Sequence, residues 1–386
     1  MYFVDSATSQ NENQYSLFQL IKELKNKNIP ENQYIQYVER FLEFKARKKR
    51  VPVSGTFELT PLCNFDCKMC YIHLDKKQFS KQLLAVESWK RIIIEAQKAG
   101  MLKASLTGGE CLTYPGFDDI YFFLRERGIR CAILSNGYFM DETRVDFLRK
   151  NPPALIQITL YGGSEEVYEK VTGKRAFQRV YRNICMLRDA GLNVTIGITP
   201  NEFMYDDRYK VIDAAQSTGV PYHINAALIT PRAETGREKK DITVEHYIEM
   251  VNYSNQLKHV ESRPVDLTEL PEENSSGSKR YGLQCGGARS GFTIRYDGTM
   301  SPCAALDSIT SNPLEVGFKN AWEDIVKQAD RYPLPEECSG CAYEFSCFHC
   351  VAMHKDAPVF GHCNPQICER TKKMISSGII SLSHKR

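Results

Sequence analysis

The sequence predicts an α/β protein organised around a parallel sheet, and two observations support that prediction. Between residues 53 and 230, short strand-like runs alternate with segments of helical periodicity. Each strand-like run is followed by a helical segment or a turn, and alternation at this spacing is typical of parallel strands joined by right-handed crossovers. Six such repeats would build either a doubly wound sheet or a partial barrel. In both architectures ligands bind at the carboxyl ends of the strands.

The six strand-like runs follow one another in order along this region. They are GTFELT (55–60), LKASLTGGE (102–110), RCAILSNG (130–137), ALIQITLYG (154–162), NVTIGITP (193–200) and PYHINAALI (221–229). Helical patterns separate them at 85–100, 117–128, 141–151, 177–191 and 208–219. Gly100 is a typical stop signal for the first of these helices, and Asp141 stands in the N-cap position of the third.

Composition narrows the class of protein. The chain has 386 residues, of which 42% are hydrophobic and 25% charged, and its formal net charge is +3. These values are typical of globular domains and imply neither a nucleic-acid partner nor a membrane partner. No apolar run is long enough to span a bilayer, and MYFVDSATSQNENQ at the start lacks the basic and apolar regions of a signal peptide. We therefore expect a cytoplasmic protein, whose thiols stay reduced.

The 14 cysteines are clustered. Cys63, Cys67 and Cys70 have the spacing C-x3-C-x2-C directly after the first predicted strand, and eight more cysteines lie beyond residue 284. In a reducing compartment such clusters indicate metal ligands rather than disulfides. Three thiolates are one fewer than a structural zinc or a four-iron cluster takes. They would leave one iron of a [4Fe–4S] cluster open to bind a substrate or cofactor.

Two glycine-containing motifs follow the next two strands. TGGE (107–110) ends the second strand-like run, and SNG (135–137) ends the third. Each of them alone is typical of a turn. Their position on the same edge of the sheet as the three cysteines favours a single site.

Taken together, CNFDCKMC, LTGGE and LSNG resemble the motifs of the radical S-adenosylmethionine (radical SAM) enzymes. The resemblance implies a partial (β/α)6 TIM-like barrel in which Cys63, Cys67 and Cys70 hold a [4Fe–4S] cluster that binds S-adenosylmethionine (SAM) at its open iron. Such enzymes cleave SAM reductively to a 5′-deoxyadenosyl radical, which abstracts hydrogen from a substrate. The residue before the third cysteine, usually aromatic in the family, is here Met69, whose thioether would pack against adenine.

The same resemblance assigns the contacts with SAM. Gly108 and Gly109 would let the backbone approach the methionine moiety, where a Cβ would collide. Glu110 would hydrogen-bond near the ammonium group of SAM, and Ser135 and Asn136 would contact its ribose. No residue is assigned as the general base.

The C-terminal cysteines have two interpretations. Because C-x2-C is the commonest zinc spacing, zinc sites are one of them. The other is the SPASM extension, which carries two auxiliary [4Fe–4S] clusters in many radical SAM enzymes and which YDGTMSPC, NAWEDI and CERTKKM resemble. By this resemblance, the ligands of one cluster would be Cys338, Cys341, Cys347 and Cys368. The ligands of the other would be Cys285, Cys303 and Cys350. Either Cys363 completes the latter set or one iron there stays open.

The resemblance covers about residues 53–230 and 285–375. It divides the chain into an N-terminal helical segment (1–52), the radical SAM barrel (53–230), a linker (231–284) with a mobile loop at 270–282, the SPASM domain (285–375) and a basic tail (376–386). In the first of these parts Pro30 separates two apolar helical stripes, which we expect to pack against the barrel.

We therefore expect a radical SAM oxidoreductase that resembles the maturases of ribosomally made peptides. Its substrate would be a peptide or protein side chain, modified by oxidation, crosslinking or thioether formation, with flavodoxin or ferredoxin as reductant. The alternative substrate is a small molecule such as a cofactor precursor or sugar alcohol. The peptide substrate is inferred from family analogy alone. A non-catalytic zinc or electron-transfer protein is a third interpretation, of a different class.

Overall fold

The computed structural model describes residues 16–74, 79, 82–260, 282–283, 285–338, 341–343, 346–347, 350, 352 and 362–380. Its strands form one sheet in the order β6-β5-β4-β3-β2-β1-β7-β8. The strands are β1 Ser54–Glu58, β2 Lys103–Thr107, β3 Arg130–Ser135, β4 Leu155–Leu160, β5 Val194–Ile198, β6 Tyr222–Ile224, β7 Gly291–Ile294 and β8 Met300–Ser301. The first six are the predicted strands, and neighbours among them pair in parallel.

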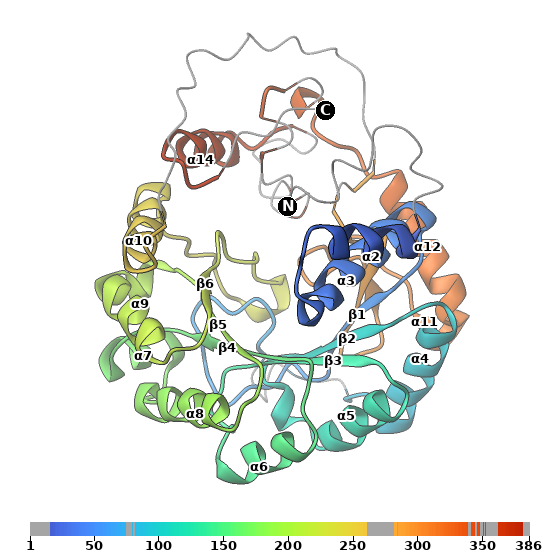
Figure 1. The fold of residues 1–386 in the computed structure, drawn as a ribbon, viewed down its shortest axis with the longest axis horizontal. Helices are drawn as coiled ribbons and strands as arrows, with labels where there is room; N and C mark the ends of the chain where they lie inside the picture. Colours follow the sequence, from blue (N-terminus) through green and yellow to red (C-terminus); the bar gives the residue numbers. More distant parts are fainter. Residues whose placement is uncertain are drawn as a thin grey trace.

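The sheet curves, and helices cover its convex side (Figure 1). The helices that follow the predicted strands are α4 Val86–Lys98, α5 Phe117–Glu126, α6 Glu142–Lys150, α8 Phe177–Asp189 and α9 Arg208–Ser217. Asp141 caps α6 as predicted, because its side chain accepts a hydrogen bond from the backbone N–H of Arg144 at 3.1 Å. This arrangement is a partial (β/α)6 barrel, as the sequence predicted.

One further helix, α7 Glu165–Thr172, lies between β4 and α8 and was not predicted. Its cap signals are present in the sequence. The Ser164 hydroxyl accepts a hydrogen bond from the backbone N–H of Val167 at 3.3 Å, and Gly173 ends the helix with a φ of +70°. Because the helix has only eight residues, its capping residues are a clearer sequence signal than its periodicity.

The strand β7 continues the sheet beyond the six repeats. It pairs in parallel with β1, with Phe57 beside Ile294, and β8 returns antiparallel to it. Part of the region predicted as a C-terminal extension therefore completes the sheet of the barrel. A chain of edge-to-face aromatic contacts strengthens this junction, since Phe57 contacts both Trp89 on α4 and Phe292 on β7 at ring-centroid distances of 5.8 and 6.1 Å.

The other α-helices described after β6 extend the helical layer at the two ends of the curved sheet (Figure 1). They are α10 Val244–Leu257, α11 Pro313–Val316, α12 Phe318–Asp330 and α14 Pro365–Ser376. The predicted NAWEDI helix is part of α12, whose Phe318 packs on Phe292 with ring centroids 5.0 Å apart. The helix α14 is tied to α10 by an ion pair between Lys373 and Glu245. The predicted loop 270–282 lies outside the described residues, apart from position 282.

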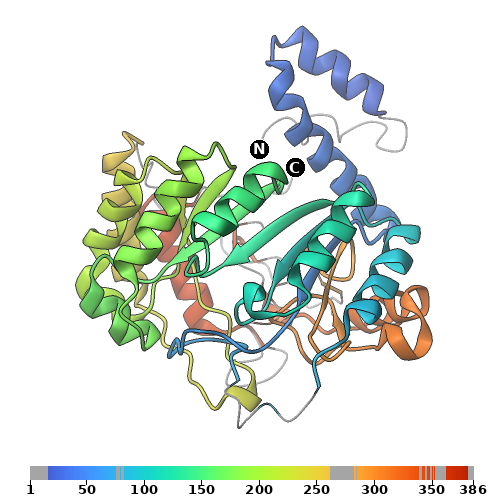
Figure 2. The same ribbon diagram turned by 90° about the horizontal axis from the view of Figure 1, so that it is seen from below.

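The N-terminal helices α2 Leu17–Asn26 and α3 Tyr34–Lys49 form a hairpin that projects from the barrel (Figure 2). The expectation that their apolar stripes pack against the barrel was wrong. Leu20, Leu24 and Phe41 form a small core of their own, separate from the main core. Two short helices pair their apolar faces with each other when no other apolar surface lies opposite. Among the described helices, none combines the length and apolar character needed to cross a membrane.

Candidate functional site

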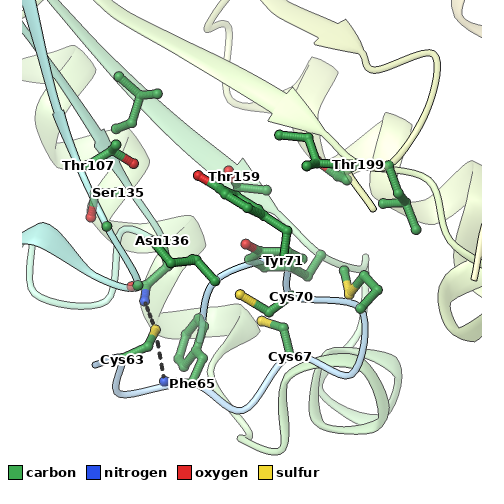
Figure 3. Close-up of a pocket in the computed structure, with 18 of the residues that line it drawn as sticks. Cys63, Phe65, Cys67, Cys70, Tyr71, Thr107, Ser135, Asn136, Thr159 and Thr199 are labelled. Carbon is green, nitrogen blue, oxygen red and sulfur yellow. Dashed lines mark hydrogen bonds between the residues drawn. The ribbon is translucent and has the colours of Figure 1, made fainter. Parts of the chain in front are cut away.

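The three cysteines of the C-x3-C-x2-C motif lie in a loop at the carboxyl end of β1. All three line one pocket of about 360 Å³ (Figure 3). The end of α7 supports the loop from outside, because the backbone N–H groups of Asp66 and Lys68 donate to the carbonyls of Thr172 and Val171 at 2.8 and 3.0 Å. The helix that the sequence did not reveal therefore positions the cysteine loop.

The cysteine sulfurs accept hydrogen bonds from the surrounding chain. Sγ of Cys63 accepts from the backbone N–H of Phe65 at 3.3 Å and from the side-chain amide of Asn136 at 3.5 Å. Sγ of Cys70 accepts from the backbone N–H of His73 at 3.3 Å. In Figure 3 the thiols of Cys67 and Cys70 point toward the side of the pocket where Cys63 lies.

Burial makes these thiols costly to ionise without a cation. It raises the pKa of Cys63 to about 12, with a further contribution from the charge of Glu110. It raises the pKa of Cys67 well above the usual value, and the neighbouring Cys70 and Cys63 raise it further. Three buried thiols that oppose one another's ionisation are stable as thiolates only when metal cations share their charge.

The three thiols are a donor set of the kind that holds an iron–sulfur cluster. Among the described residues, no group of three or more His, Cys, Asp or Glu side chains is placed to share one ion. Thiolates that each bind a different iron of a cluster are spread more widely than thiolates that share one ion. N–H groups directed at the sulfurs are a further feature of cluster sites.

The two glycines of the TGGE motif allow the cysteine loop to pack closely on β2. Gly108 has a φ of +148°, and a Cβ there would lie 2.4 Å from the carbonyl oxygen of Thr60. A Cβ on Gly109 would lie 2.5 Å from the carbonyl oxygen of Leu62. The backbone N–H of Gly109 donates to Thr60 at 2.7 Å, so the close approach forms a hydrogen bond. Both glycines also line the pocket.

Glu110 lies behind the pocket rather than in its lining. Its buried carboxylate accepts from the hydroxyl of Ser135 at 3.0 and 3.1 Å, from the backbone N–H of Asn136 at 2.8 Å and from that of Leu112 at 3.1 Å. Burial raises the pKa of Glu110, and these donors oppose that rise. The carboxylate therefore joins the end of β2 to the end of β3. Ser135 and Asn136 themselves line the pocket.

Polar side chains from the later strands complete the lining, and sequence analysis did not single them out. They are Gln157, Thr159, Tyr161, Thr199 and Asn225. On β4 the polar positions alternate with Ile156, Ile158 and Leu160, which are buried on the other face of the strand. This alternation within LIQITL was a readable signal that one face of the strand lines a polar cavity.

The C-terminal cysteines gather in two places. The pKa of Cys303 is raised to about 11, first by burial and then by Cys350 and Cys285, so both of these thiols lie within electrostatic reach of Cys303. Burial also raises the pKa of Cys347, with a contribution from Cys368 on α14. Sγ of Cys347 accepts from the hydroxyl of Thr371 at 3.5 Å.

The other predicted ligands are only partly described. Cys341 is half-buried, and Cys338 ends a short 3-10 helix, Glu336–Cys338. The backbone N–H of Cys363 donates to the carboxylate of Glu337 at 3.2 Å, and the thiol of Cys363 is half-buried.

A buried ion pair between these cysteine groups is a second feature that sequence reasoning missed. Nη2 of Arg232 lies 2.9 Å from both carboxylate oxygens of Glu58, the last residue of β1. Burial raises the pKa of Glu58, and the charges of Arg232 and Arg295 oppose that rise. A glutamate inside the strand-like run GTFELT indicates a buried carboxylate that needs a positively charged partner. The sequence does not identify that partner, which lies 174 residues away.

Comparison with known proteins identifies related chains. Residues 57–214 match the profile of the radical SAM superfamily. The sporulation killing factor maturation protein SkfB of Bacillus subtilis (strain 168) is 24% identical over 293 residues, which are 75% of this chain and 68% of SkfB. The AdoMet-dependent heme synthase of Methanosarcina barkeri (strain Fusaro / DSM 804) is 24% identical over 318 residues, 77% of this chain and 90% of the synthase.

A solved structure has the same fold. The crystal structure of Streptococcus suis SuiB bound to the precursor peptide SuiA aligns with a TM-score of 0.65 and 16% identity, and the alignment covers 90% of this chain and 87% of SuiB. At this identity the likeness establishes the fold alone.

Proposed function

Because this chain carries a radical SAM domain over residues 57–214, we propose that it is an enzyme that modifies a side chain of a ribosomally made peptide. The observation that carries this proposal is the pocket in which Cys63, Cys67 and Cys70 meet the carboxyl ends of the barrel strands. A [4Fe–4S] cluster held by these thiols would supply the electron that cleaves SAM to a 5′-deoxyadenosyl radical.

The residues around this pocket have distinct roles in the proposal. Gly108 and Gly109 keep the wall beside the cysteine loop free of side chains, so that SAM lies against the backbone. Ser135 and Asn136 present polar groups to SAM, and Glu110 holds both of them in place from behind. The polar residues of β4 and of the segments that follow β4, β5 and β6 bind and orient the remaining polar groups of SAM and substrate.

A peptide substrate is supported by the related proteins, and the pocket itself has the size of a small-ligand site. A volume of about 360 Å³ is near the lower end of the roughly 300–1,000 Å³ typical of small-ligand sites. A maturation protein is among the relatives, and SuiB was solved with a precursor peptide.

The proposed product is an oxidised residue, a crosslink or a thioether. Forming one crosslink or thioether removes two hydrogen atoms from the peptide. The 5′-deoxyadenosyl radical takes one of them and becomes 5′-deoxyadenosine. The other leaves as a proton and an electron, and a one-electron carrier of the flavodoxin or ferredoxin class accepts that electron. A carrier of the same class supplies the electron that cleaves SAM.

We also propose two auxiliary clusters. Cys285, Cys303 and Cys350 would hold one, since Cys303 lies within electrostatic reach of the other two. Cys363 is the candidate for its fourth ligand. The ligands of the other would be Cys338, Cys341, Cys347 and Cys368. Proximity of Cys347 to Cys368 supports this second set.

A small-molecule substrate is the second candidate, and one observation favours it. The similarity to the AdoMet-dependent heme synthase covers 90% of that protein. A cofactor precursor would then occupy the pocket in place of a peptide side chain.

The test uses the full chain, reconstituted anaerobically with iron and sulfide, together with SAM, dithionite and candidate precursor peptides encoded next to its gene. We expect 5′-deoxyadenosine and a peptide that has lost two hydrogen atoms, both detected by mass spectrometry. Cys67→Ala should abolish both, whereas Cys185→Ala, in the half-buried α8 thiol, should change neither. Unchanged peptides with continued 5′-deoxyadenosine formation would favour the small-molecule candidate. A chain that binds zinc and forms no 5′-deoxyadenosine would refute both.

A further inference from the structure

Arg232 and Glu58 form an ion pair that is closed off from solvent. The two residues are 3% and 0% exposed, and Nη2 of Arg232 lies 2.9 Å from each oxygen of the carboxylate. The hydroxyl of Tyr71 also donates to this carboxylate, at 3.3 Å. An arginine stays ionised in proteins, so the pair places a permanent positive charge inside the molecule.

This ion pair touches both of the cysteine groups that flank it. On one side, the backbone N–H of Arg232 donates to the carbonyl of Tyr71, the neighbour of Cys70, at 3.1 Å. The guanidinium also lies 5.4 Å from the centre of the Tyr71 ring. On the other side, Nη2 donates to the carbonyl of Ala304, the neighbour of Cys303, at 3.2 Å. Arg232 therefore bridges the two groups of thiols.

Several guanidinium N–H groups near Glu58 have no acceptor among the described residues. Arg295 follows β7 where β7 pairs with β1, and its charge acts on Glu58 together with that of Arg232. Nε and Nη1 of Arg232 and Nε and Nη2 of Arg295 are buried and have no acceptor within the described part of the chain. The charges of two guanidinium groups thus act on the buried carboxylate of Glu58, and the exposed Glu234 adds a second negative charge that acts on Arg232. Buried N–H groups without acceptors indicate that an anionic group belongs beside them.

We propose that Arg232 is a shared cation that raises the reduction potentials of the two neighbouring clusters, one at Cys63, Cys67 and Cys70 and one at Cys285, Cys303 and Cys350. This inference rests on the proposed function. A cluster becomes more negative when it is reduced, so a nearby positive charge and N–H groups directed at sulfur stabilise the reduced form. Glu58 holds the guanidinium in place and partly offsets its charge, which makes Glu58 a positioning residue.

The test measures midpoint potentials, by redox titration followed with electron paramagnetic resonance, and needs no turnover. Each of the two clusters is examined alone in the full-length chain, after Cys→Ala changes at the three thiols of the other group and at Cys347 and Cys368 of the third proposed cluster. At the wild-type midpoint, Arg232→Gln should lower the reduced-to-oxidised ratio of each cluster about tenfold, which is a shift of about 59 mV for one electron. Glu58→Gln should raise the ratio. The double variant Glu58→Gln/Arg232→Gln should lie between the two single variants.

Controls separate electrostatics from damage to the fold. Arg149→Gln removes an exposed arginine that pairs with Asp146 on α6, and we expect it to leave both potentials unchanged. Iron content and circular dichroism are measured for every variant. If Arg232→Gln and Glu58→Gln shift the potentials in the same direction, the electrostatic role is wrong. Unchanged potentials in an iron-loaded Arg232→Gln chain would overturn this inference and leave the proposed function intact. A wild-type chain that binds no iron would overturn both.

Discussion

The side-chain amide of Asn136 donates to Sγ of Cys63 at 3.5 Å and to Oδ1 of Asn64 at 2.8 Å, which ties the end of β3 to the first cysteine of the loop. The resemblance implied a ribose contact for Asn136, and the structure gives this residue a second task. Its amide holds the cysteine loop in position at the edge of the pocket (Figure 3).

Replacing Asn136 should therefore loosen the loop. Asn136→Ala leaves two acceptors without their donor, and we expect it to lower the free energy of unfolding by about 1–2 kcal/mol. Iron retained after reconstitution should fall as well. Urea denaturation and iron analysis measure the two effects. Asn193→Ala is the matched control, because Asn193 donates to the carbonyl of Ala154 on an exposed part of the chain. Equal iron retention in the two variants would contradict the role of Asn136.

A methyl group at Gly108 should destabilise the junction between the loop and β2. Its Cβ would lie 2.4 Å from the Thr60 carbonyl at a φ of +148°, so we expect Gly108→Ala to cost about 3 kcal/mol in unfolding free energy. Gly191→Ala isolates the effect of φ alone, since Gly191 has a φ of +72° and no heavy atom within 4 Å of a new Cβ. We expect about 1 kcal/mol there. Urea denaturation of both variants tests the difference. Similar decreases in unfolding free energy would show that the backbone at Thr60 moves away from the new Cβ at little cost.

Acid should weaken the contact between α9 and α10 through Glu249. Hydrogen bonding from Tyr209 lowers the pKa of Glu249, and Arg208 and Tyr205 contribute. A carboxylate with a lowered pKa in the folded state stabilises the fold above its ordinary pKa near 4.5 and loses that contribution as the pH falls through the lowered value. Glu249→Gln should therefore reduce the dependence of the urea midpoint on pH below about 4.5. The same slope in both proteins would argue against this contribution.

Loading with iron and sulfide should raise the thermal midpoint, because clusters that bind only the folded chain shift the equilibrium toward it. Three [4Fe–4S] clusters correspond to about twelve iron atoms per chain. The double variant Cys347→Ala/Cys368→Ala should lose about a third of the iron and part of the thermal stabilisation. Cys185→Ala should keep both. Full iron content in the double variant would exclude these two thiols as ligands.

Local patterns predicted much of the barrel. The strands β1 to β6 were predicted because each is a short apolar run bounded by turn residues. The N-cap of α6 was predicted because Asp141 acts on a backbone N–H only three residues away. Such features depend on neighbours along the chain, and the sequence displays those neighbours directly. The helix α7 was not predicted, because its sequence signal lies in its capping residues Ser164 and Gly173 rather than in its periodicity.

Long-range partners were not predictable in the same way. The strand β7 joins β1 across more than 230 residues of sequence, and no local pattern specifies which strand it pairs with. Arg232 reads as part of a polar linker, yet it is buried against Glu58. The direction of the Glu110 carboxylate, away from the pocket and toward Ser135, also depends on how β2 and β3 lie together.

By itself, the sequence determined that three thiols follow the first strand of a parallel sheet, because spacing and periodicity are properties of adjacent residues. Only the tertiary structure decided which charges and donors surround those thiols. Packing brings Asn136 and Arg232 to them from two distant segments, and the energy of a buried charge such as that of Glu58 depends on partners that meet only when the chain is folded.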